Sequence, residues 1–147
     1  MNIYKKIFFI FLFLSLDQVS KFFVKKMDAP LEIFSFFHIN FVQNEGIAFS
    51  LPFPKIAVII LTICVLIFLF EVLIRKKLTK IETFCTILIF AGASGNLIDR
   101  IIDGKVTDFL AFWDFPIFNL ADSFISVGVC LLIADEIFLK KFLSKKN

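Results

Sequence analysis

Asp108 and Asp122 are the residues of this chain best suited to catalysis. If two carboxyl groups lie close together, both cannot be ionised, so one keeps a proton while the other stays charged. The charged member can deprotonate a water and the protonated member can polarise a carbonyl, which is general acid–base hydrolysis of an amide. Asp108 falls in a predicted loop and Asp122 in the first turn of a predicted helix. A nucleophile–histidine mechanism is not expected, because His38 is the single histidine and lies in another loop.

Both aspartates belong to polar clusters that interrupt an otherwise apolar chain. A carboxylate near the core of a bilayer is costly unless it is paired, hydrated or neutralised. The clusters therefore indicate a polar site built inside a membrane or at its edge. They are Asp17-Gln18-Val19-Ser20-Lys21, Asn44-Glu45-Gly46, Asn96-Leu97-Ile98-Asp99-Arg100, Val106-Thr107-Asp108-Phe109 and Asn119-Leu120-Ala121-Asp122.

The composition places the chain among integral membrane proteins. Of its 147 residues, 59% are hydrophobic and 23 are phenylalanine, whereas soluble domains are nearer half apolar. Only a helix lets an open chain pair all its backbone groups within the bilayer. Runs of about 20 apolar residues, enough to cross a hydrocarbon core of about 30 Å, predict spans at residues 5–24, 56–74, 81–102 and 118–139.

The first run has the basic start and apolar core of a secretory signal peptide. No small-x-small cleavage site follows it, and Asp17 interrupts where such a site would be expected. A retained first span is therefore favoured over a cleaved leader.

The distribution of lysine and arginine predicts that both termini are cytoplasmic. Ten of these residues flank the spans on one side and six on the other, and cytoplasmic loops carry the excess. Residues 25–55 and 103–117 are then the outer segments, and the Phe- and Ile-rich stretch 34–42 predicts a small β-like platform. We expect a single domain, 1–147, built as a four-helix membrane bundle with an extracytoplasmic platform. All five clusters would meet at its outer face.

Several cluster residues have a structural interpretation beside a functional one. Asp17 and Lys21, four positions apart, suit an ion pair on one helical face. Asp99 suits a structural ion pair with Arg100, and Arg100 would in addition contact a substrate. Asp122 is harder to explain structurally, because no basic residue lies within four positions of it.

The remaining polar residues predict less. Asn44 and Gly46 would ordinarily form a turn. The three cysteines show no close pairing, and His38 has no acidic or cysteine partner at ligand spacing, so neither a disulfide nor a metal site is expected. No basic patch carries interleaved aromatic residues, so nucleic acid is not an expected partner.

At these residues the chain resembles lipoprotein signal peptidase, the type II signal peptidase of bacteria. The likeness covers nearly the whole chain, and the five clusters match the family's motif blocks in order. Ala91 departs from the family, in which glycine is common at this position. The second block continues to Ser50, the third begins at Gly92 and the fifth at Phe118.

The resemblance implies an aspartic endopeptidase of the bacterial cytoplasmic (inner) membrane, with no cofactor. It would remove the signal peptide from prolipoproteins, cutting before a cysteine that carries a diacylglyceryl group, and we expect a monomer. Asp108 and Asp122 become the catalytic dyad, without an assignment of base and acid. Asn44, Gly46, Asn96, Arg100 and Asn119 become substrate-binding or orienting residues, and Asp17, Lys21 and Asp99 become structural support.

A transporter or proton-coupled channel is the main alternative, because carboxylates in membranes often relay protons or bind cations. Four spans are few for an alternating-access carrier, and the carboxylates gather at one face without a line to the other. A membrane scaffold, the third class, would not need two unpaired aspartates.

Overall fold

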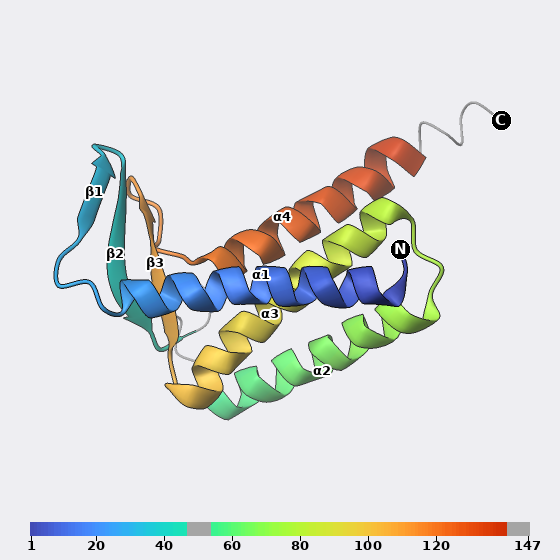
Figure 1. Cartoon of the computed structure of the whole chain (residues 1–147), viewed down its shortest axis with the longest axis horizontal. Helices are drawn as coiled ribbons and strands as arrows, with labels where there is room; N and C mark the ends of the chain where they lie inside the picture. The colour runs from blue at the N-terminus through green and yellow to red at the C-terminus, as the bar shows by residue number, and fades with distance from the viewer. Residues whose placement is uncertain (47–53, 141–147) are drawn as a thin grey trace.

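The chain forms a bundle of helices with a small sheet at one end (Figure 1). The structure, a computed structural model, describes residues 1–46 and 54–140. The sheet lies at one end of the bundle, while the N-terminus, the link between α2 and α3 and the end of α4 lie at the other. The elements are α1 (Ile3–Val24), β1 (Leu31–Phe34), β2 (Phe37–Asn44), α2 (Lys55–Arg75), α3 (Lys80–Ile102), β3 (Val106–Phe112), α4 (Leu120–Ala134) and a π-helical segment, η2 (Asp135–Lys140).

Side-chain caps fix where three of the helices begin. Asn2 accepts the backbone N–H of Lys5 at the start of α1. A capping box opens α3: Thr79 accepts from the backbone of Glu82 at 3.1 Å, and Glu82 accepts from the backbone of Thr79 at 2.8 Å. A second capping box opens α4. Each cap satisfies amide N–H groups that the first helical turn leaves without partners.

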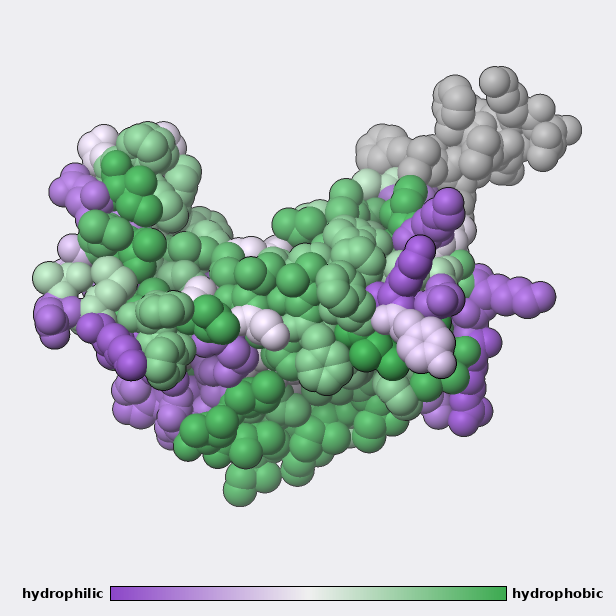
Figure 2. All heavy atoms as spheres, viewed as in Figure 1, coloured by the Kyte–Doolittle hydropathy of each residue, from purple (hydrophilic) through white to green (hydrophobic). Residues whose placement is uncertain are grey.

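The outer surface of the bundle is that of a membrane protein. Within the described residues, α1, α2 and α3 are each long and apolar enough to cross a bilayer. Large side chains such as Phe11, Ile56 and Phe68 are more than 60% exposed. Figure 2 shows hydrophobic residues over the middle of the bundle and hydrophilic ones gathered towards its two ends. A soluble protein rarely exposes so large an apolar surface, so the predicted membrane helical class is confirmed.

The predicted boundaries of the first three spans agree with α1, α2 and α3 to within two residues. The fourth prediction, 118–139, begins two residues early, because Asn119 is the cap and α4 starts at Leu120. After 15 residues α4 passes into η2, which continues to Lys140.

The predicted platform is a three-stranded antiparallel sheet in the order β1-β2-β3. The expectation that Asp108 lies in a loop is wrong, because residues 106–112 form β3. Pairing with β2 holds this strand, with Val42 opposite Asp108 and Asn44 opposite Val106. The partner strand lies more than 60 positions away along the chain, so the local sequence around Asp108 does not reveal it.

Small residues let α3 and α4 approach closely, and α3 also packs against α1 and α2. A β-carbon at Gly92 would lie 2.4 Å from the backbone oxygen of Ala121 and 2.9 Å from Ile125. One at Gly128 would lie 2.9 Å from the backbone oxygen of Cys85. Such contacts are typical of closely packed membrane helices. They set the spacing of the two helices that carry Asn96 and Asp122.

We predict that Gly92→Ala lowers the melting temperature in detergent. Alanine has the better helix propensity by about 1 kcal/mol, but its methyl group would push the α4 backbone away, and overpacking costs about 1–3 kcal/mol. Ser94→Ala, two positions along α3 at a partly exposed site, serves as the control. An unchanged or higher melting temperature for Gly92→Ala would contradict the close packing.

Candidate active site

Asp108 and Asp122 open onto one cavity. Asp108 is on β3 and Asp122 is in the first turn of α4. Both line a cavity of about 860 Å³, together with Asn44, Asn96 and Arg100. The rest of its wall is largely apolar and comes from α2, α4 and the segment 115–118. Two carboxyl groups far apart in the sequence thus share one partly apolar space.

Two asparagines donate to the two carboxylate oxygens of Asp108. The Nδ2 of Asn44 donates to one oxygen at 2.9 Å, and the Nδ2 of Asn119 donates to the other at 2.6 Å. Asn44 reaches Asp108 because its neighbour across the sheet is Val106, which places Asp108 diagonally opposite on the same face. The Oδ1 of Asn44 accepts the backbone N–H of Gly46 at 2.9 Å. This bond fixes which end of the amide faces Asp108.

Burial dominates the protonation of Asp108. The pKa of Asp108 is raised to about 6, chiefly by burial and in addition by the charge of Asp122. The hydrogen bonds from Asn44 and Asn119 and the charge of Lys21 act in the opposite direction. A carboxyl with a pKa in this range exchanges its proton near neutral pH, as an acid–base catalyst must.

Asp122 is held by Asn96 and by the start of its own helix. The Nδ2 of Asn96 donates to Asp122 Oδ1 at 2.7 Å. Asp122 Oδ2 is 3.4 Å from the backbone N–H of Asn119, while Asn119 Oδ1 accepts the backbone N–H of Asp122 at 2.9 Å. The Nδ2 of Asn119 is therefore free to face Asp108. Asn119 contacts both aspartates, because it is at once the helix cap and a donor.

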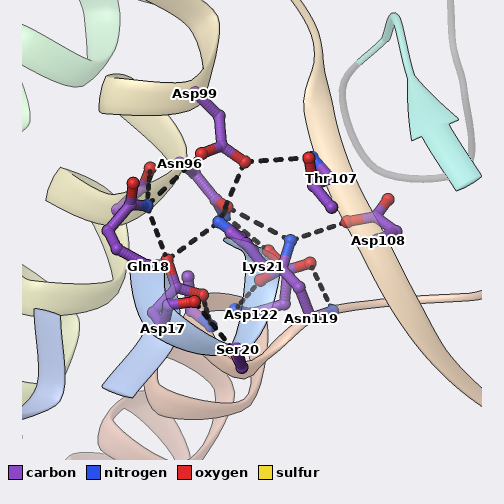
Figure 3. A network of polar contacts seen from close by, with 12 residues as sticks. Asp17, Gln18, Ser20, Lys21, Asn96, Asp99, Thr107, Asp108, Asn119 and Asp122 are labelled. Atoms are coloured by element: carbon purple, nitrogen blue, oxygen red, sulfur yellow. Dashed lines mark hydrogen bonds and ion pairs between the residues drawn. The ribbon is translucent and has the colours of Figure 1, made fainter. Parts of the chain in front are cut away.

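A buried ion cluster lies behind the two aspartates (Figure 3). The ammonium of Lys21 is 2.8 Å from Asp17 and 3.1 Å from Asp99. The predicted pairing of Asp17 with Lys21 is confirmed. The alternative pairing of Asp99 with Arg100 is wrong, because adjacent residues on a helix do not face each other. Asp99 instead accepts from Lys21 and from the backbone N–H of Thr107 at 3.0 Å.

Asp17 ties α1 to the start of α4. Its Oδ1 accepts the backbone N–H of Ala121 at 2.9 Å, one of the amides that the first turn of α4 leaves open. A β-carbon at Gly95 would lie 2.3 Å from Asp17 Oδ2, so glycine is needed where α3 passes this carboxylate. Gln18, which the sequence did not single out, donates to Asp17, to Asp99 and to the backbone of Gly95.

Arg100 lies at the rim of the cavity. Its guanidinium contacts the backbone oxygens of Gly46 at 3.3 Å and Asn96 at 3.4 Å. Within residues 1–46 and 54–140 it forms no ion pair with a carboxylate. Its charge is therefore available to a ligand in the cavity. The rest of the second motif block, 47–50, lies outside the described residues.

The arrangement matches a known enzyme family. Residues 9–138 match the family model for Signal peptidase (SPase) II. The chain belongs to the signal peptidase II family. The predicted resemblance to lipoprotein signal peptidase is confirmed, and so is the prediction that the chain is an aspartic peptidase of a membrane.

Similar proteins agree over most of the chain. It is 40% identical to the lipoprotein signal peptidase of Fusobacterium nucleatum, with 90% of this chain and 88% of the relative covered. It is 38% identical to that of Bartonella bacilliformis, with 90% and 89% covered. A solved structure described as a bacterial membrane enzyme superposes with a TM-score of 0.86 at 34% identity, covering 99% of this chain and 93% of the other. The sequence thus agrees with the signal peptidase II family, and the fold agrees with that of a solved bacterial membrane enzyme.

We predict that substitutions at Asn119 separate its capping role from its donor role. Asn119→Ser keeps an oxygen that caps α4 and should retain the melting temperature, whereas Asn119→Ala should cost about 1 kcal/mol of stability. Both remove the donor to Asp108, so cleavage should fall by about tenfold or more in each. Melting curves and cleavage rates of the two variants test this. Normal cleavage by the serine variant would exclude a donor role.

Proposed function

We propose that this signal peptidase II removes the signal peptide from diacylglyceryl-modified prolipoproteins, with Asp108 and Asp122 as the catalytic dyad. The cut would fall just before the lipidated cysteine. The observation that carries the proposal is that both aspartates line one cavity while Asn119 contacts both of them. This juxtaposition supports a shared task for the two carboxyl groups.

In the proposed mechanism the pair holds one proton. The ionised carboxylate takes a proton from a water whose oxygen attacks the scissile carbonyl carbon. The protonated carboxyl donates to the carbonyl oxygen, which gives a tetrahedral diol. The carboxyl that took the proton from water then passes it to the amide nitrogen, which leaves as the amine. The other carboxylate takes a proton from one hydroxyl of the diol, so the product is a carboxylic acid and the pair again holds one proton. Asn44, Asn96 and Asn119 orient the dyad. Arg100 and the backbone of Gly46 at the rim bind the peptide.

The cavity suits a lipidated substrate. Apolar side chains such as Leu61, Ile125 and Phe118 make up much of its wall. Acyl chains already hold the substrate in the bilayer, because each buried methylene contributes about 0.8 kcal/mol. The enzyme then needs only to present the dyad at the height of the cysteine. Asp17, Lys21 and Asp99 support the dyad from behind.

We place the enzyme in the bacterial cytoplasmic membrane with four spans, α4 and η2 together forming the fourth. The start of α1, the end of α2 and the start of α3 lie at the end of the bundle opposite the sheet (Figure 1). By sequence, these helix ends carry Lys5, Lys6 and the basic residues of 75–80. The bias of basic residues supports cytoplasmic termini and an extracytoplasmic sheet and dyad. We further propose that the chain forms a single domain, acts as a monomer and does not bind nucleic acid.

The decisive experiment compares lipidated prolipoprotein with its unlipidated form as substrates of the purified chain in detergent. Only the lipidated form should be cut. Asp108→Asn and Asp122→Asn should each reduce cleavage by at least about 100-fold, because each removes one acid–base partner, while their melting temperatures stay near that of the parent. Asp114→Asn, an exposed aspartate of the segment after β3, is the matched control. Normal processing by either dyad variant would remove that residue from the dyad.

The pH dependence of cleavage follows from the raised pKa of Asp108. Because the charge of Asp122 contributes to this rise, we propose that the single proton of the pair resides on Asp108. Above about pH 6 the free enzyme should lose that proton, and kcat/KM should fall. Asn44→Leu removes a donor that favours the charged form, so the pKa of Asp108 should rise and this alkaline limb should move up by about one pH unit.

Profiles of kcat/KM against pH for the parent and Asn44→Leu measure this shift. Gln43→Leu is the control, because Gln43 is the exposed neighbour of Asn44 on β2 and points to the other face of the sheet. If the alkaline limb of the Asn44→Leu profile stayed in place or moved to lower pH, the proposed effect of Asn44 on Asp108 would be excluded.

A further inference from the structure

Lys21 is an unusual residue to find inside a helical bundle. It is 1% exposed, and an ammonium so far from water is tolerated only when its donors are all used. Two contacts go to Asp17 and Asp99. The third goes to an uncharged group, the Oδ1 of Asn96, at 3.1 Å. The two carboxylates explain why the ammonium is buried, but they do not explain this third contact.

The contact with Lys21 decides how the amide of Asn96 is turned. Its Oδ1 accepts from Lys21 at 3.1 Å and from Asn119 at 3.2 Å. With the oxygen so engaged, the Nδ2 must face the other way, where it donates to Asp122 at 2.7 Å. If the amide were flipped, its oxygen would face a carboxylate oxygen, an acceptor against an acceptor. Two N–H donors therefore hold the orientation that Asp122 needs.

We propose that Lys21 is a positioning residue of the reaction, which acts through Asn96 to keep an N–H donor on Asp122. The proposal rests on the proposed dyad, and it gives Lys21 a role beyond support of the fold. Because Asn119 donates both to Asn96 and to Asp108, the same fixed amide also steadies the second aspartate. The ammonium of Lys21 thereby decides which N–H groups donate to Asp108 and Asp122, although it forms no hydrogen bond with either carboxyl group.

The chain contains a matched lysine for comparison. Lys25, four positions after Lys21, is the C-cap of α1 and forms an ion pair with Asp103, the C-cap of α3. Like Lys21, it links α1 to α3, but among the described residues it has no hydrogen bond to an asparagine. Lys25 is about a third exposed and Lys21 is buried, so the loss of Lys25 should cost less stability, and the two variants are compared at a temperature where both are folded. If Lys21 positions the dyad, only its removal should slow the chemical step.

The test measures kcat and KM for lipidated prolipoprotein with Lys21→Met, Asn96→Ala, their double variant and Lys25→Met. Lys21→Met should lower kcat by about tenfold to 100-fold, as expected when a reacting group is misplaced, with KM changed less than about threefold. Lys25→Met should behave like the parent. The double variant should be no slower than the slower single variant, because both changes disable the same donor. The proposal would be overturned if the losses of kcat in the two single variants multiplied in the double variant. It would also be overturned if Lys21→Met kept the kcat of the parent.

A charge-matched variant separates positioning from folding. Asp17→Asn with Lys21→Met leaves the net charge of the ion cluster unchanged and should melt closer to the parent than Lys21→Met alone, while kcat stays low. Recovery of kcat, or failure of both variants to fold, would make Lys21 a structural residue only.

Asp108→Asn is assayed in parallel to separate the two proposals. If Asp108→Asn cleaves normally, the proposed dyad is wrong. If Asp108→Asn is inactive while Lys21→Met is active, only the positioning role of Lys21 is rejected.

Discussion

A carboxylate removed from water needs hydrogen-bond donors, and this requirement organises the site. Asp17 and Asp99 receive theirs from a buried ammonium and from backbone amides. Within residues 1–46 and 54–140, the donors to Asp108 are side-chain amide N–H groups. Amides stabilise a negative charge less than a cation does, so these donors leave burial as the stronger influence on Asp108. The groups that donate directly to Asp108 are thus neutral amides, whereas Asp17 and Asp99 contact a cation, and this difference suits a carboxyl group that must gain and lose a proton.

The same hydrogen bonds begin a helix and build the site. Asn119 caps α4 through its side-chain oxygen and donates to Asp108 through its nitrogen. Asp122 closes the capping box and faces the cavity. The positions of Asp108 and Asp122 are therefore tied to where α4 starts, and the close contact between Gly92 and the backbone of Ala121 ties that start to α3. In this bundle the same residues cap α4, pack it against α3 and place the two carboxyl groups. A change in one of these contacts therefore alters the others.

Hydropathy was enough to predict three helices closely, because a lipid-facing helix is selected residue by residue for its apolar surface. The motif blocks also singled out the residues that meet at the cavity. The strand β3 was missed because it depends on pairing with β2, which local sequence does not encode. The partner of Asp99 was missed for a similar reason: Lys21 comes from another helix. The contribution of Thr107 is a backbone N–H, so its side chain gave no signal.

The bond between Asp17 and the backbone of Ala121 joins positions 104 residues apart. A ribosome releases α1 long before it has made α4, and the first helix enters the membrane with its acidic and basic groups already four positions apart and able to neutralise each other. The unfinished polypeptide then holds Asp17 and Lys21 but lacks Asp122. If Asp122 is a member of the catalytic dyad as proposed, proteolytic capacity arises only when the last helix has been made, and an incomplete chain cannot cleave.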